Sequence, residues 1–270
     1  MASGTCFIQS SSLSYALLPF LYRRTTLLST NLRQLHSFSS KSLTTKSPLM
    51  KVFAQARRFS PKQVEIASTD DILFESPLKI VKYPDPILRA GNKRIGTFDE
   101  NLKKLVFEMF DIMYKTDGIG LSAPQVGMNI RLMVFNPAGE RGVGEEIVLI
   151  NPRVQKYSRK MVLFDEGCLS FPGIYAGVQR PESVKVDAQD ITGENFSVDL
   201  SRLPARVFQH EFDHLQGTLF FDRMTEEVVD SIREELQALE KKYEDRTGFP
   251  SPEKIGTSKA RKVVTGFGRS

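Results

Sequence analysis

Residues 209–217, QHEFDHLQG, constrain this chain more than any other segment, because they hold two histidines four residues apart with an acid between them. On an α-helix this spacing puts His210 and His214 one turn apart on the same face, with Glu211 beside them. The HExxH arrangement is typical of a divalent-metal site that carries its own base. The chain has three histidines, and the third, His36, lies in a segment that we expect to be removed. The pattern therefore predicts a metal centre on one helix.

The helix that carries this centre is predicted to be mostly buried. Its N-cap is predicted at Ser201 and its end at Gly217. At about 100° per residue, one stripe of the helix contains Leu203, Val207, His210 and His214, and the neighbouring face contains Phe208, Phe212 and Leu215. The arc left for water or polar partners consists of Ala205, Arg206, Gln209, Asp213 and Gln216. A buried imidazole needs a hydrogen-bond partner or a metal, so two of them one turn apart favour a metal.

The third ligand of this metal has two candidates. A catalytic site of this kind takes three protein ligands and keeps a further position open. Cys168, in the segment EGCLSFP of residues 166–172, would complete a thiolate and two imidazoles, although an isolated cysteine is commonly just a small buried hydrophobe. A glutamate such as Glu234 or Glu235 would instead give the His₂Glu site of a metallopeptidase. The periodicity of the sequence does not distinguish the two.

A glycine-punctuated loop, GIGLSAPQVG, occupies residues 118–127. It lacks both the Gly-Lys-Ser ending of a phosphate loop and the third glycine of a dinucleotide fingerprint. Gly118 and Gly120 would let a substrate backbone approach closely, and Gln125 offers a carboxamide donor next to the chain-stiffening Pro124. The loop is therefore either a structural turn or part of a substrate site.

The rest of the body predicts an α+β domain. Apolar residues at helical spacing predict an amphipathic helix over residues 98–114 and a second one, expected to pack on the domain, over residues 225–243. Short strand-like runs occupy residues 130–137, 146–152, 160–167, 183–190 and 195–200, the last two as a hairpin. Strands this close together in sequence imply mainly antiparallel pairing. We expect the catalytic domain over residues 65–245 and a flexible basic tail over residues 246–270.

The first 64 residues differ in composition from the body. They contain no Asp or Glu but nine Lys and Arg among many Ser and Thr, so the net charge of +5 arises in this leader and the body is mildly acidic. An acid-free, Arg- and Ser-rich N-terminus is typical of an organellar transit peptide, with a disordered basic tail as the alternative. The apolar stretch over residues 15–22 is too short to span a bilayer and contains Pro19, so we expect no membrane anchor. Cys6 lies in the leader, so the mature chain, with Cys168 alone, cannot form an internal disulfide.

Taken in order, GIGLSAPQVG, EGCLSFP and QHEFDHLQG resemble the three signature motifs of the peptide deformylases, and the similarity extends over about residues 80–224. The resemblance implies an α+β fold in which antiparallel sheets surround the central HExxH helix, with an N-terminal helix and a C-terminal amphipathic helix. It also selects Cys168 over the downstream glutamates as the third ligand. Together with the leader, the motifs make the chain similar to the organellar enzyme of a plant.

The activity that this resemblance implies is removal of the formyl group from the N-terminal methionine of newly made chains. It puts one divalent metal on Cys168, His210 and His214, with Fe²⁺ as the first choice and Zn²⁺ as the alternative. Water activated by the metal would attack the formyl carbon, with Glu211 as general acid/base and the Gln125 side chain and Leu169 backbone N–H as oxyanion donors. The predicted substrate contacts are Gly118, Gly120 and Gly167, with an apolar slot for methionine lined by Ile119, Leu203 and Val207.

The expected partners are nascent peptides that begin with N-formyl-methionine, in the chloroplast stroma, the mitochondrial matrix or both; no specific nucleic acid is expected. Basic residues dominate positions 251–270, which predicts either a solvated tail or a ribosome contact. The choice between monomer and homodimer stays open. Gly173, Ile174 and Tyr175 follow the cysteine motif where bacterial relatives often carry charged residues, so contacts to substrate residues after the methionine are expected to differ. The alternative functions are a His₂Glu metallopeptidase and a deformylase-like protein that binds formyl-methionine peptides without turnover.

Overall fold

A computed structural model of the chain describes residues 65–256. The leader predicted over residues 1–64 lies outside the described residues, as do residues 257–270 of the expected tail. The described part contains seven strands and four α-helices together with short 3₁₀ turns, in the α+β arrangement that the sequence predicts. No helix within residues 65–256 is long and apolar enough to cross a membrane.

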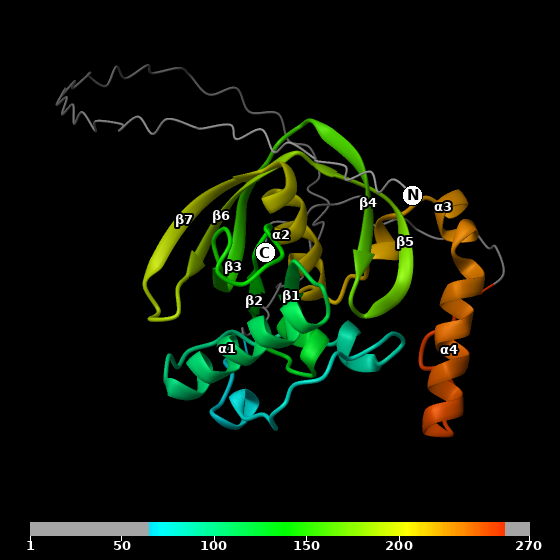
Figure 1. Cartoon of the computed structure of the whole chain (residues 1–270), viewed down its shortest axis with the longest axis horizontal. Helices are drawn as coiled ribbons and strands as arrows, with labels where there is room; N and C mark the ends of the chain where they lie inside the picture. Colours follow the sequence, from blue (N-terminus) through cyan, green and yellow to red (C-terminus); the bar gives the residue numbers. More distant parts are fainter. Residues whose placement is uncertain (1–64, 257–270) are drawn as a thin grey trace, which may run out of the picture. The chain divides into compact units, whose positions relative to one another are not determined.

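The helix that carries the HExxH motif, α2 (Arg202–His214), lies at the centre of the fold, between two antiparallel sheets (Figure 1). The larger sheet has the strand order β1-β2-β3-β6-β7, with β1 at Gly120–Ser122, β2 at Leu132–Phe135, β3 at Ile147–Tyr157, β6 at Ser183–Gln189 and β7 at Asn195–Ser201. The smaller sheet is the hairpin of β4 (Met161–Cys168) and β5 (Phe171–Pro181). Both sheets contact α2, and the helix is buried by this enclosure.

Burial of α2 is more complete than its sequence predicts. Its apolar face packs with the inner face of the larger sheet in one cluster that includes Phe208 and Phe212. The arc predicted to face water or polar partners is also enclosed, because Arg206, Gln209 and Asp213 are all less than 9% exposed. The helix gives way to a turn ending at Gly217, whose backbone φ of +66° and close approach to a neighbouring backbone carbonyl both require glycine.

The first helix, α1 (Glu100–Lys115), follows the prediction closely. The carboxylate of Asp99 caps its start by accepting the backbone N–H groups of Asn101 and Leu102, each at 3.0 Å. Its buried face packs with β1 and β2 below the larger sheet, so α1 closes one end of the core. Two strands were not predicted: β1 lies inside the glycine-punctuated loop, and β5 contains Pro and Gly residues that weaken any strand pattern.

The second amphipathic helix, predicted as one piece over residues 225–243, is two helices, α3 (Glu226–Ser231) and α4 (Arg233–Thr247). Between them Ile232 leaves the helical region, with φ −116° and ψ 11°. This break turns the chain so that Val229, Ile232 and Leu236 all enter the cluster formed by β5 and the 3₁₀ turn η4 (Phe220–Arg223). The other 3₁₀ turns are η1 (Asp70–Ile72), η2 (Pro86–Arg89) and η3 (Ala123–Val126).

Residues 246–256 differ from the flexible tail that was expected to begin at residue 246. Ile255 is buried, and its backbone N–H donates to the Glu240 carboxylate at 2.7 Å. Glu253 forms an ion pair with Arg89 at 2.5 Å, which fastens this segment to η2. The folded domain therefore extends beyond the predicted boundary at residue 245, to at least Gly256.

Candidate metal centre

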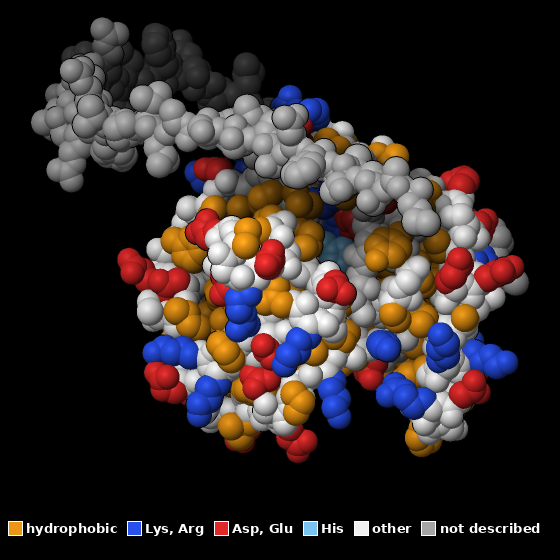
Figure 2. Space-filling view, viewed as in Figure 1, with side chains coloured by type: hydrophobic (Ala, Val, Ile, Leu, Met, Phe, Trp, Pro, Cys, Tyr) orange, Lys and Arg blue, Asp and Glu red, His pale blue; other side chains and the backbone are white. Residues whose placement is uncertain are grey.

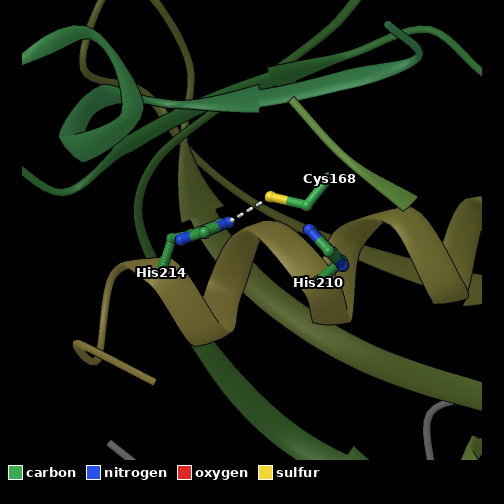
Figure 3. A group of neighbouring side chains, drawn as sticks. All are labelled: Cys168, His210 and His214. Carbon is green, nitrogen blue, oxygen red and sulfur yellow. Dashed lines mark hydrogen bonds between the residues drawn. The ribbon is translucent and has the colours of Figure 1, made fainter. Parts of the chain in front are cut away.

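Three side chains converge between α2 and the end of β4. The sulfur of Cys168 and one ring nitrogen each from His210 and His214 all lie within 4.8 Å of one another (Figure 3). The two imidazoles rise from consecutive turns of α2, and the Cys168 Sγ lies 3.4 Å from His214 Nε2. The alternative ligands Glu234 and Glu235 are exposed on α4 and do not belong to this group.

The position of Cys168 depends on an irregularity in the β4–β5 hairpin. Gly167 pairs with Tyr175, but the next pair joins Cys168 to Phe171, so the regular register ends at the cysteine. A Cβ at residue 167 would come within 2.5 Å of the Tyr175 ring, so any larger residue at this point would displace that ring. The hairpin thus places the Cys168 thiol beside the histidines, at the residue where the strand pairing changes.

The orientation of the His210 ring is fixed by a hydrogen bond at Nδ1, the ring nitrogen away from the metal side. Its Nδ1 lies 3.0 Å from an oxygen of Glu166, which leaves Nε2 for the metal side. Arg180 and Arg206 donate to the same carboxylate, each with a bond of 2.6 Å. Burial alone would raise the pKa of Glu166, but the charge of Arg180 and the bond from His210 outweigh it and hold that pKa well below its usual value. Glu166 therefore stays an acceptor that fixes the imidazole.

Arg180 and Asp213 continue this buried network. The guanidinium of Arg180 is fully buried and donates to Asp213 at 2.7 Å, and Arg223 donates to the same carboxylate at 2.5 Å. Burial would lower the pKa of Arg180, yet Glu166 and Asp213 raise it above its usual value. Each buried charge is thus paired, as a low-dielectric site requires.

Sequence reasoning missed this network. The sequence places Asp213 and Arg206 on the polar arc of the helix without indicating a partner, and it shows Glu166 only as part of the cysteine motif. Arg180 carries no local signal at all, because nothing in a strand sequence shows that a charged side chain points inward. Two arginines and one acid from different elements become neighbours only when β4, β5 and α2 pack together.

Glu211 lies beside the ligands and is 4% exposed. Burial raises the pKa of Glu211 to about 7, against the charge of His210 and the hydroxyl of Ser122, which both lower it. Within residues 65–256, the Glu211 Oε2 atom has no hydrogen-bond partner. A Cβ at residue 120 would lie 2.7 Å from Glu211 Oε1 and 2.6 Å from Val207 Cγ1, so Gly120 is the close neighbour of this carboxylate.

Gln125 is held in a fixed orientation by Ser122, another residue whose role sequence reasoning missed. The backbone N–H and the hydroxyl of Ser122 donate to the Gln125 side-chain oxygen at 2.9 and 2.8 Å. This directs the amide nitrogen toward the metal group, where it donates to Cys168 Sγ at 3.5 Å. Both Ser122 and Gln125 are at most 1% exposed. The carboxamide is therefore a preset donor at the metal group.

A cavity of about 610 Å³ opens onto this group. Four of the six predicted substrate residues line it, namely Gly118, Ile119, Gly120 and Gly167, together with Cys168 and the predicted oxyanion donor Leu169. The segment from Phe171 to Tyr175 also lines it. In Figure 2 a pale blue histidine side chain is visible within a hollow near the middle of the molecular face. The glycine loop and the cysteine motif thus form two walls of one cavity.

The structure does not bring Leu203 to this cavity. Leu203 is 39% exposed and lines a separate depression with Phe164 and Arg206. Its stripe position is correct, but it occupies the first turn of α2, about 10 Å along the axis from His210. Val207, one turn closer, is buried against Gly120 and does adjoin the site.

These residues fit a divalent metal. A thiolate with two imidazoles suits zinc or ferrous iron. The carboxylate behind His210 is the outer partner that such a ligand usually has.

Comparison with known proteins gives the family. The family model described as "Polypeptide deformylase" matches residues 77–229, more than half of the chain, and this stretch contains all three motifs. The chain belongs to the polypeptide deformylase family. The peptide deformylase 1B of Arabidopsis thaliana, chloroplastic/mitochondrial, is 64% identical over 272 residues that span the whole of both chains. The chloroplastic peptide deformylase 1B of Solanum lycopersicum is 69% identical over 236 residues, which cover 86% of this chain and 84% of the tomato protein.

Solved deformylase structures share the fold. A crystal structure of a plant peptide deformylase is 76% identical, with a TM-score of 0.67, and covers 67% of this chain and 99% of its own. The Plasmodium falciparum peptide deformylase is 46% identical with a TM-score of 0.61 and covers 63% of this chain and 99% of its own. The predicted fold and the predicted enzyme class are confirmed: the chain is a peptide deformylase, a hydrolase. The predicted organellar location agrees with the chloroplastic and mitochondrial relatives.

Proposed function

We propose that this deformylase removes the formyl group from the N-terminal methionine of polypeptides made in the chloroplast or the mitochondrion, and that residues 1–64 direct it there. The observation that carries the catalytic part is the approach of three ligand atoms to within 4.8 Å, with the buried Glu211 carboxylate beside them. A hydrolase needs an activated water and a group that moves its proton, and this arrangement supports both.

The proposed metal ligands are Cys168, His210 and His214, which would hold one divalent ion. When bound, the ion would polarise the formyl oxygen and lower the pKa of a water. Ferrous iron is our first choice and zinc the alternative, since a thiolate and two imidazoles accept both. Metal analysis of the full chain purified without oxygen, compared with its Cys168→Ala variant, tests the assignment. Retention of one equivalent of metal by the variant would contradict it.

Glu211 is the proposed general acid/base. Its burial and its pKa of about 7 support a carboxyl group that takes a proton near neutral pH and can return it. Glu211 would accept the proton of the attacking water and then pass it to the leaving amine of methionine. One carboxylate can serve both steps because the C–N bond breaks after the attack.

Gln125 and the Leu169 backbone N–H are the proposed donors to the negative oxygen that develops on the formyl carbon. Ser122 holds the Gln125 amide so that its nitrogen faces the metal group, which supports this role because a preset donor costs no reorganisation during the reaction. Leu169 follows Cys168 directly and lines the same cavity.

Substrate recognition is assigned to the walls of the cavity. Gly118, Gly120 and Gly167 would let the peptide backbone approach, with Gly120 hydrogen-bonding to it. Ile119 and Val207 would line the slot for the methionine side chain. Leu203, which lines another depression, has no part in this slot.

The decisive experiment is hydrolysis of formyl-Met-Ala by the metal-loaded chain and by its Glu211→Gln variant. We expect the wild type to release formate. The variant should keep its metal and lose activity by about 10²- to 10⁴-fold, the usual contribution of a positioned acid/base group. If the variant hydrolyses the peptide at the wild-type rate, Glu211 is not the acid/base.

The tail is a separate proposal. Lys259, Arg261 and Lys262 lie beyond the described residues, and a basic segment of this kind suits a contact with the ribosome. Deleting residues 257–270 should weaken co-sedimentation with ribosomes at low salt. Unchanged co-sedimentation would leave the segment as a solvated tail.

A further inference from the structure

A second cavity, of about 500 Å³, adjoins the substrate cavity. Ile80, Lys82 and Pro172 line both, so the two cavities are neighbours along one edge. From this edge the second cavity, which we call the side groove, runs between the segment of residues 79–85 and α4. Val81, Tyr83, Leu239 and Tyr243 give it an apolar floor, and its rim is polar.

The rim of the side groove is cationic. Four of its lining residues carry positive charge: Lys79, Lys82, Lys242 and Arg246. All four are exposed, and within residues 65–256 none of them forms an ion pair with a carboxylate. The one acid in the lining, Asp85, already accepts the Ile87 backbone N–H at 3.1 Å. In Figure 2 Lys and Arg side chains gather at the lower right, over the part of the face that α4 occupies in Figure 1.

This concentration of charge departs from the rest of the domain. The body of the chain is net acidic, and some exposed lysines elsewhere are paired, such as Lys115 with Asp111 at 2.5 Å and Lys160 with Glu182 at 2.6 Å, whereas the side groove gathers four cations without a carboxylate partner in the described part of the chain. Four such cations around one groove repel each other, and Arg246 among them has a cation–π contact with Tyr243, at 5.6 Å from the ring centroid. The charges are available for an anionic ligand.

We infer that the side groove binds the part of the formylated polypeptide beyond its second residue and favours aspartate and glutamate there. The inference rests on the proposed function, which places formyl-methionine at the metal group. A chain that leaves the substrate cavity past Ile80 and Pro172 enters the side groove directly. The recess has an apolar floor between two walls, which suits one extended peptide with carboxylates directed at the rim.

The size of the effect follows from exposed charge pairs. A single exposed ion pair contributes little free energy in a salt-containing buffer. Several cations acting on two carboxylates should therefore change the KM about fivefold at low ionic strength. The same effect should shrink in about 0.5 M NaCl, where the screening length falls below 5 Å. The turnover number should respond little, because the groove lies beyond the reacting bond.

The test compares formyl-Met-Ala peptides that carry two Asp, two Lys or two Ser at positions three and four or at positions five and six. The metal-loaded full chain should show a KM about fivefold lower for the Asp peptide than for the Lys peptide at one of the two placements. The double variant Lys242→Glu, Arg246→Glu should abolish or invert that ratio. The control variant Arg153→Glu, Lys156→Glu changes the net charge equally on exposed β3 residues that line neither cavity, and should keep the ratio.

The outcomes separate this inference from the function on which it rests. If the Ser peptide is not hydrolysed, the proposed function fails. If the Ser peptide is hydrolysed but Asp and Lys peptides have equal KM values at both placements, only the inference about the side groove is overturned. It is also overturned if the α4 variant loses binding to a single-stranded RNA while its peptide ratio stays at the wild-type value, since the groove would then serve nucleic acid.

Discussion

At the scale of single residues, the site depends on contacts so close that adding a single methyl group should abolish most of the activity. Gly120 is the clearest case, because a methyl group there would lie 2.6 Å from Val207 and 2.7 Å from Glu211. Neither neighbour can withdraw easily, since both are buried on α2. The glycine was predicted for its approach to the substrate; the structure adds that it also makes room for Glu211.

We expect Gly120→Ala to lower kcat/KM for formyl-Met-Ala at least about 100-fold, because displacing a catalytic group by an ångström costs about that much. The added methyl group should push the Glu211 carboxylate from its place. Steady-state kinetics together with a thermal melt will distinguish a displaced carboxylate from an unfolded protein. Gly91→Ala is the matched control, since nothing lies within 4 Å of the Cβ position there. Equal activity of the two variants would refute the steric argument.

Glu166 gives a second prediction at this scale. Glu166→Gln keeps the shape of the side chain but removes the negative charge that bonds to His210 and pairs with Arg180 and Arg206. Metal affinity should fall about 10- to 100-fold, as for other partners of metal ligands. The unfolding free energy should fall by about 3 kcal/mol or more, because buried cations lose their partner.

Both effects of Glu166→Gln are measurable, by metal competition with a chelator and by denaturant unfolding. Glu182→Gln is the control, because Glu182 pairs with Lys160 at 2.6 Å on the surface, where a pair is worth about 1 kcal/mol or less. If Glu166→Gln binds metal as tightly as the control, the carboxylate does not orient His210.

At the scale of elements, the β4–β5 hairpin and α2 form the site together. The hairpin supplies the thiol, the carboxylate behind His210 and the buried Arg180, and α2 supplies the histidines, Glu211 and Asp213. The side groove depends on another pair of elements, the segment of residues 79–85 and α4. The position of α4 therefore affects recognition as well as stability.

The segment that follows α4 is expected to fix that helix. Ile255 is buried against it and donates to Glu240. Ile255→Ala should lower the unfolding free energy by about 2 kcal/mol, the lower end for a buried aliphatic side chain near a surface. Denaturant unfolding measures this value. The adjacent Lys254→Ala removes only an exposed pair with Glu244 and should cost less than about 1 kcal/mol. A result below 0.5 kcal/mol for Ile255→Ala would mean that the segment is not fastened in solution.

At the scale of the whole molecule, a bound metal would join the hairpin to the central helix, and its binding energy would add to folding stability. A chelator should therefore lower the melting temperature of the wild type. At a free metal concentration about 100 times the dissociation constant, the stabilisation lost is about 2.7 kcal/mol. The melting temperature of Cys168→Ala should not respond to the chelator. A chelator-induced shift of equal size in both proteins would show that the thiol is not a ligand.

The three motifs in their order determined much of the result without any coordinates. HExxH on a helix gives two ligands and a base from spacing alone, because helix geometry is local. The cysteine and glycine motifs, read with their resemblance, gave the family. The leader predicted the organelle from composition. All of these signals are contained in short stretches of chain, which is why the sequence sufficed for them.

Tertiary packing decided the rest. The buried charges around Glu166 come from β4, β5 and α2, and no local pattern shows that they meet. Leu203 has the right helical phase but lies too far along the helix axis from the metal group. Helical phase determines the side of the helix on which a residue lies and not its position along the axis. The break at Ile232, the fastened segment after α4 and the cations of the side groove likewise depend on which surfaces pack together. The sequence determined the chemistry of the site; the packing of distant segments decided what orients it and what lies next to it.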